Sequence, residues 1–86
     1  MTTTKGKYRV GTTFNPSGND VVDEIKARAA DLIDFIENEI DVPPHETPNE
    51  TRQSAEIARL KALAQTEIES AAMWAVKAAT KRKPGE

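Results

Sequence analysis

Apolar residues recur every three or four positions along two long stretches of the chain, which is the spacing of a helical face. In the first stretch they are Val22, Ile25, Ala29, Leu32, Ile36 and Ile40, with Ile33 beside this stripe. Ser17, followed three residues later by Asp20, predicts the start of this helix. Pro43 and Pro44 cannot continue it. We therefore predict a helix over residues 18–40.

The second stretch has a clearer beginning. The segment Thr47-Pro48-Asn49-Glu50 combines a threonine cap, a proline at the first helical position and a glutamate at the third, the pattern of a capping box. One face then carries Ile57, Leu60, Ala64, Ile68, Ala71, Ala75 and Ala78, flanked by Leu63, Met73, Trp74 and Val76. A run of cations suits the helix C-terminus, and Pro84 and Gly85 end the pattern. The prediction is a helix over residues 48–80.

Two helices joined by a short connector predict an all-α fold, an antiparallel helical hairpin. At about 1.5 Å per residue the first helix would be roughly 34 Å long and the second roughly 50 Å, which leaves about 15 Å of the second without a partner in the chain. Apolar residues on more than one of its faces favour burial on more than one side, so we predict a homo-oligomeric helical bundle. The alternative is that its alanines reflect helix propensity alone.

An N-terminal arm, residues 1–17, precedes the hairpin of residues 18–80, and a basic tail, residues 81–86, follows it. The chain has 86 residues, which corresponds to one small domain. It contains no cysteine, so disulfides and thiolate metal ligands are excluded. No apolar run approaches the roughly 20 residues of a membrane-spanning helix, and the N-terminal residues contain no apolar stretch of about 7 to 15 residues, as a signal peptide would. We expect a soluble intracellular protein with no cofactor, no metal and no membrane partner.

Charge is distributed unevenly, although the net charge is only −2. The cations Lys5, Lys7 and Arg9 stand in a segment without acids, residues 1–19, whereas residues 20–50 are strongly acidic. The acidic segment would repel a long polyanion, which argues against extended nucleic acid. Charge therefore favours a compact anionic ligand, held by a few cations, over DNA.

Residue patterns typical of catalysis are missing from the sequence. The single histidine, His45, has no second histidine or cysteine near it, so we interpret it as a solvated loop residue. No serine stands in a nucleophile elbow, and there is no glycine-rich phosphate loop. We do not expect an enzyme.

The arm and the start of the first helix each allow two interpretations. Tyr8 and Phe14 could stack on a base, with Lys7 and Arg9 beside them as phosphate-binding cations. Alternatively, the two rings could pack the arm over the hairpin together with Val10. Lys26 stands at the edge of the apolar stripe, where it could reach a phosphate or pair with Asp23 three residues earlier. The residues alone leave both choices open, with packing and the Asp23 pair as the defaults.

Three segments of the chain together resemble a known family. They are TTFNPSG, VVDEIKARAADLIDFI and ARLKALAQTEIESAAMWAVKA, and the most specific part is the run from Leu63 to Ala75. Over about residues 8–80 the sequence resembles the phage anti-CBASS family of cyclic-oligonucleotide sponges, the second type described.

The resemblance implies a protein that performs no reaction. It implies a homo-oligomer, a hexamer arranged as three dimers, that sequesters bacterial cyclic di- and trinucleotides in the cytoplasm of the infected host and so prevents activation of CBASS effectors. By the same resemblance the dinucleotide site falls on Phe14, which precedes Asn15-Pro16 and would stack a base, and on Lys26, which would hold phosphate, with Tyr8 as a rival for stacking. A second, trinucleotide site falls on Arg59 and Thr66.

Two departures from the family pattern bear on base preference. Asn15 stands where many members have histidine, and the spacing from Phe14 to Lys26 is shorter than usual. A different class of function also stays open, in which the helices form an oligomerisation module that binds a protein partner and the arm serves only for packing.

Overall fold

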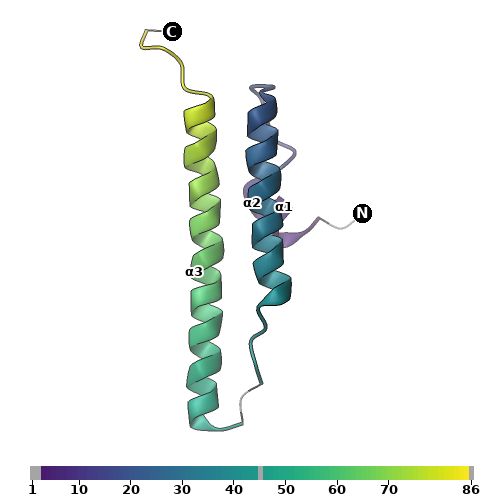
Figure 1. The fold of residues 1–86 in the computed structure, drawn as a ribbon, viewed down its shortest axis with the longest axis vertical. Coiled ribbons are helices and arrows are strands. Elements are labelled where there is room, and N and C mark those ends of the chain that lie inside the picture. The colour runs from purple at the N-terminus through teal and green to yellow at the C-terminus, as the bar shows by residue number, and fades with distance from the viewer. Residues whose placement is uncertain (1–2, 45, 86) are drawn as a thin grey trace.

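The computed structural model describes residues 3–44 and 46–85, which form three α-helices: α1 (Lys5–Val10), α2 (Asp20–Glu39) and α3 (Pro48–Ala79). The two long helices, α2 and α3, form the antiparallel hairpin expected from the sequence, and α1 lies behind α2 in Figure 1. His45 lies outside the described residues, as do the outermost residues of the predicted arm and tail, 1–2 and 86. Within the described residues no helix is both long enough and apolar enough to cross a membrane.

The beginning of α3 follows the prediction. Thr47 Oγ1 accepts a hydrogen bond from the Glu50 backbone N–H at 3.1 Å, and Pro48 is the first helical residue. The other half of the capping box is shifted by one residue, because the Glu50 carboxylate accepts from the backbone N–H of Glu46 at 3.2 Å and not from that of Thr47. The helix ends at Ala79, one residue before the predicted end.

The beginning of α2 differs from the prediction. Asn19 caps the helix, since its side chain accepts from the Val21 backbone N–H at 2.9 Å, and the predicted Ser17 cap is wrong. The Ser17 hydroxyl instead donates to Asn15 Oδ1 at 2.6 Å. An asparagine two residues later is as good a cap, so α2 starts at Asp20 and not at residue 18.

The arm contains a short helix, α1, which we did not predict. Thr4 Oγ1 accepts from the Lys7 backbone N–H at 3.2 Å, and Gly11, at φ 72°, closes the helix in the left-handed conformation that glycine adopts readily. Gly6 faces α2 and donates its backbone N–H to Asp34 Oδ1 at 2.7 Å. A Cβ at Gly6 would collide with the Ala30 carbonyl group, so only glycine allows this approach.

The face that α3 turns toward α2 also differs from the predicted one. Gln65 is buried on this face, where its amide donates to the Ile33 carbonyl at 3.2 Å. The Lys61 ammonium donates to the carbonyls of Glu37 and Ile40 at 2.9 and 2.8 Å. Hydrogen-bonded polar side chains thus make part of the contact between α3 and α2 that we assigned to the apolar stripe. Several residues of the predicted face are exposed instead: Leu60, Ala64, Ala71 and Ala78.

The first turns of α3 extend past the end of α2, as their unequal lengths predicted. The connector between the helices runs back along this part of α3 (Figure 1). Ser54 is buried under the connector and donates its hydroxyl to the Pro43 carbonyl at 2.6 Å. The overhang is therefore partly covered by the chain itself, which the helix lengths alone could not indicate.

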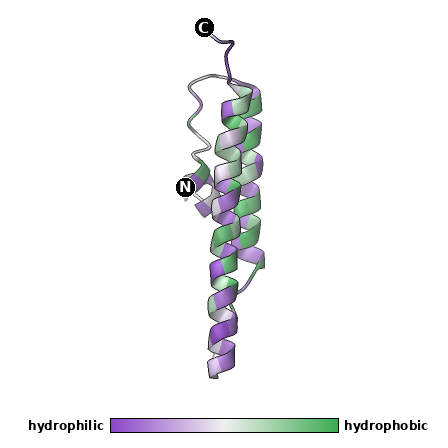
Figure 2. Cartoon of the chain, turned by 90° about the vertical axis from the view of Figure 1, so that its left-hand side faces the viewer, coloured by the Kyte–Doolittle hydropathy of each residue, from purple (hydrophilic) through white to green (hydrophobic). Residues whose placement is uncertain are grey.

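The core within one chain is small. Its buried apolar residues are Val22, Ala30, Ile33 and Ala72. The chain measures 60 × 33 × 13 Å, and its radius of gyration of 16.7 Å exceeds the roughly 12 Å of a compact domain of this length. Figure 2 shows hydrophobic residues along both long helices, many of them exposed: Val21, Leu32, Phe35, Leu60, Leu63, Met73 and Trp74. One chain therefore leaves much apolar surface in contact with water.

Candidate functional site

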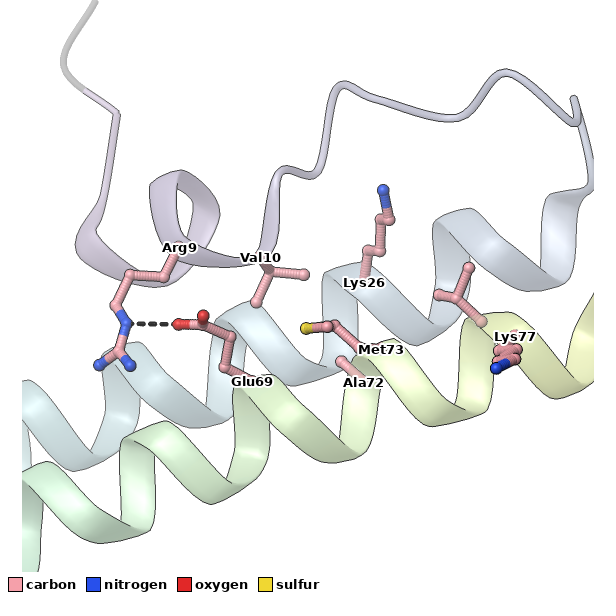
Figure 3. Close-up of a pocket in the computed structure, with 8 residues that line it drawn as sticks. Arg9, Val10, Lys26, Glu69, Ala72, Met73 and Lys77 are labelled. Atoms are coloured by element: carbon pink, nitrogen blue, oxygen red, sulfur yellow. Dashed lines mark hydrogen bonds and ion pairs between the residues drawn. The ribbon is translucent and has the colours of Figure 1, made fainter.

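A hollow of about 430 Å³ lies where α1, α2 and the C-terminal half of α3 meet (Figure 3). Its volume is in the range of small-molecule sites. Cations and apolar side chains dominate the lining, which consists of Arg9, Val10, Lys26, Glu69, Ala72, Met73, Val76 and Lys77. Such a lining suits a ligand that combines negative charge with an apolar or aromatic ring.

Arg9 is held in a fixed position at one end of the hollow. Its Nε donates to Glu69 Oε1 at 2.7 Å and its Nη2 donates to Thr66 Oγ1 at 3.2 Å. Figure 3 shows this ion pair beside Val10 and Met73, which supply apolar surface. The guanidinium has five N–H donors and uses two of them here, so it can donate to an anion without moving.

Lys26 reaches upward from α2 to the loop that follows α1 (Figure 3). Its ammonium donates to the carbonyl of Gly11 at 3.1 Å and to the carbonyl of Phe14. The expected default, a pair between Lys26 and Asp23, is wrong, because the Asp23 carboxylate accepts from the Asn15 side chain instead. An ammonium has three donors, so Lys26 keeps one for a ligand.

Phe14 places its ring beside Lys26, with 5.4 Å between the ammonium nitrogen and the ring centroid, and 70% of the residue is exposed. Tyr8 is 80% exposed and follows the buried Gly6 by two residues, which points it away from the hairpin. The packing interpretation of the arm therefore holds for Val10 and is wrong for Tyr8 and Phe14. The structure brings Phe14 and Lys26 together and leaves Tyr8 apart from them within one chain.

Arg59 and Thr66 do not meet in the structure. Arg59 pairs with Glu56 on the exposed side of α3, and the hydrogen bond between them lowers the pKa of Glu56 and raises that of Arg59. Thr66 accepts from Arg9. The two residues stand seven positions apart on α3, about 10 Å along its axis, and only Thr66 is connected to the hollow, through Arg9.

A polar network fixes α1 over the hairpin. Lys5 donates to Glu37 and to Gln65, both at 2.9 Å, and Gln65 donates to Glu37 at 3.1 Å. The hydrogen bond from Lys5, and after it the one from Gln65, lowers the pKa of Glu37 from 4.5 to about 2. With the contact between Gly6 and Asp34, these bonds hold the helix that supplies Arg9 and Val10 to the hollow.

Of the eight residues that line the hollow, Lys26 was assigned to a site from the sequence and seven were not: Arg9, Val10, Glu69, Ala72, Met73, Val76 and Lys77. A signal was available for the two on α1, because Thr4 and Gly11 are a cap and a terminator around a six-residue segment. In a helix over residues 5–10, Arg9 and Val10 follow Gly6 by three and four positions and therefore lie on the same face, toward the hairpin. Glu69 and Met73 are fixed positions of the run from Leu63 to Ala75 that carries the family resemblance, and this was the available signal for them.

The family comparison covers nearly the whole of this arrangement. A family model described as "Acb2/Tad1, hairpin domain" matches residues 5–80, which include α1, α2, α3 and every residue that lines the hollow. No curated protein and no solved structure matches the chain.

Proposed function

Because this chain belongs to the Acb2/Tad1 hairpin-domain family of cyclic-nucleotide sponges, we propose that it binds bacterial cyclic di- and trinucleotides and sequesters them without cleavage. Sequestration lowers the free concentration of the messenger, so CBASS effectors in the cytoplasm of the infected host are not activated. The observation that carries this proposal is the pairing of an exposed aromatic ring, Phe14, with Lys26, a cation that also lines a hollow of matching chemistry.

A cyclic nucleotide offers groups that suit both the cations of this hollow and the Phe14 ring beside Lys26. Its phosphates would accept from the free donors of Lys26 and Arg9, and Lys77 adds a third cation to the lining. A base would stack on the Phe14 ring, since stacking on an aromatic side chain is worth about 1–3 kcal/mol per base. Among the lining residues none carries a hydroxyl or thiol nucleophile, and the carboxylate of Glu69 is paired with Arg9. These groups favour binding over cleavage.

The proposal includes assembly into a homo-oligomer, a hexamer of three dimers. The thin shape of the chain and its exposed Phe35 and Trp74 support it, because apolar surface of this extent is usually covered. Tyr8, which points away from its own hairpin, would then face a neighbouring chain and contribute to a site there. A second site for trinucleotides at Arg59 and Thr66 belongs to the same proposal, and there both residues would exchange their present partners for the ligand.

Calorimetry and thermal denaturation with cyclic di-GMP, cyclic di-AMP and cyclic triadenylate test the function. A ligand at a hundred times its dissociation constant adds about 2.7 kcal/mol to the free energy of unfolding. Phe14→Ala and Lys26→Ala should each weaken binding about fivefold or more, since each removes a contact worth at least about 1 kcal/mol. Lys7→Ala is the matched control, because Lys7 is an exposed cation on the same arm that does not line the hollow.

Recovery of the bound nucleotide after denaturation, followed by chromatography, distinguishes capture from cleavage. We expect the intact ring. If none of the cyclic nucleotides changed the unfolding temperature while a protein from the host bound the exposed apolar faces, the interaction-module interpretation would replace this proposal.

A further inference from the structure

The ring of Phe14 is carried by the loop of residues 11–18, which follows α1 and precedes the cap of α2. The Phe14 backbone N–H donates to the Gly11 carbonyl at 3.1 Å, which closes a turn. On the hairpin side, Lys26 donates to the carbonyls of Gly11 and Phe14. These bonds fix the backbone from Gly11 to Phe14, but they leave open what attaches the chain after Phe14 to the hairpin.

Asn15 supplies that second attachment. Its Nδ2 donates to the Asn19 carbonyl at 2.9 Å and to Asp23 Oδ1 at 3.0 Å, and both acceptors belong to the first turn of α2 or to its cap. Its Oδ1 accepts from the Ser17 hydroxyl at 2.6 Å. Asn15 is half-buried, while Phe14, Pro16 and Ser17 around it are exposed. Both the nitrogen and the oxygen of the Asn15 amide are therefore hydrogen-bonded, and two of its three hydrogen bonds connect the loop to the start of α2.

We infer that Asn15 is a positioning residue, which clasps the loop to the start of α2 and so holds the Phe14 ring ready to stack a base. Lys26 holds the chain from Gly11 to Phe14 and Asn15 attaches the chain directly after Phe14, so the backbone that carries the ring is bonded to the hairpin at both points. A ring held in place before binding avoids the loss of conformational freedom that a mobile loop would suffer on binding. The inference rests on the proposed function, since it assigns Asn15 a share of ligand affinity through Phe14.

A double-mutant cycle tests whether Asn15 acts through Phe14. Asn15→Ala should weaken binding of cyclic di-AMP about three- to tenfold, the equivalent of one intramolecular hydrogen bond. In the Phe14→Ala background the same substitution should have no effect, because there is no ring left to position. An equal loss in both backgrounds would mean that Asn15 contacts the ligand itself or serves general stability, and it would overturn the inference.

A second test exchanges the amide of Asn15 and the carboxylate of Asp23 between the two positions. Asn15→Asp should weaken binding more than Asn15→Ala, because it places two carboxylates where the amide now bonds to Asp23. Adding Asp23→Asn restores a donor and an acceptor across the same gap and should recover part of the lost affinity. Asn38→Ala, on the exposed surface of α2, is the matched control and should bind as the wild type does. Failure of the exchange to recover any affinity would contradict the clasp.

The position of the ring can be observed without a ligand. The chain has two phenylalanines, Phe14 and Phe35, so fluorine-labelled phenylalanine gives two ¹⁹F signals. In Asn15→Ala the Phe14 signal should move toward the value of an unstructured chain and sharpen, while the Phe35 signal stays in place. This readout also separates the two proposals: if wild type binds no cyclic nucleotide but the Phe14 signal responds, the function fails and the clasp stands. An unchanged Phe14 signal would overturn the clasp even if binding is confirmed.

Discussion

Replacing Gly6 by alanine should release α1 from the hairpin. An added Cβ would lie 2.8 Å from both the Ala30 carbonyl carbon and Asp34 Oδ1, and closer still to the Ala30 carbonyl oxygen. Ala30 belongs to the backbone of α2, whose carbonyl groups are bonded within the helix and cannot retreat without cost. The collision must therefore be relieved by movement of α1.

The size of the effect follows from the contacts that would be lost. Overpacking costs about 1–3 kcal/mol. Movement of α1 also breaks the bond from Gly6 to the Asp34 carboxylate, and hydrogen bonds to charged groups are worth about 1.5–3 kcal/mol. The higher helix propensity of alanine returns about 1 kcal/mol at most. We expect α1 docking to weaken by about 2–4 kcal/mol.

Limited digestion with trypsin measures this docking, because α1 itself contains the cleavage sites Lys5, Lys7 and Arg9. Gly6→Ala should lose the arm roughly tenfold faster or more, while circular dichroism shows that the hairpin remains helical. Gly18→Ala is the matched control, since a Cβ at Gly18 meets nothing within 4 Å. Alanine there would bear only the backbone strain of a positive φ of 67°. Equal cleavage rates for Gly6→Ala and wild type would refute the close approach of α1 to α2.

Two further predictions concern stability. The pKa of Glu37 is depressed to about 2, so its contribution should be fully present above pH 4.5 and disappear as the pH falls toward 2. Because its side chain is 39% exposed, solvent screening leaves roughly 1 kcal/mol. In urea unfolding, wild type should exceed Glu37→Gln by this amount at pH 7 and match it at pH 2; a difference independent of pH would contradict the assignment. Ile33→Ala should cost about 2–5 kcal/mol in the same assay, since Ile33 is 0% exposed, whereas the exposed Leu32→Ala should cost much less in the isolated chain.

The candidate site was only partly predictable. Phe14 and Lys26 were assigned by resemblance, and the structure brings them within cation–π distance. The partner expected for Lys26 was wrong, because a sequence shows the neighbours of a lysine along its own helix and not the loop that folds over it. Arg9 was considered as a phosphate-binding cation of the arm but was not assigned to the site, since its role depends on a six-residue helix too short to leave a clear hydrophobic period.

The sequence by itself determined the two long helices and their approximate ends, because apolar spacing, the Thr47 cap and the prolines act within a few residues along the chain. It also carried the family, which the comparison over residues 5–80 confirms. Only the tertiary structure decided how α3 is rotated against α2, because Gln65 becomes an interior residue only when the Ile33 carbonyl lies opposite its amide. The hollow between α1, α2 and α3 was likewise decided by the tertiary structure alone. Its lining comes from positions up to 68 residues apart, Arg9 and Lys77, and they meet through packing that no local pattern encodes.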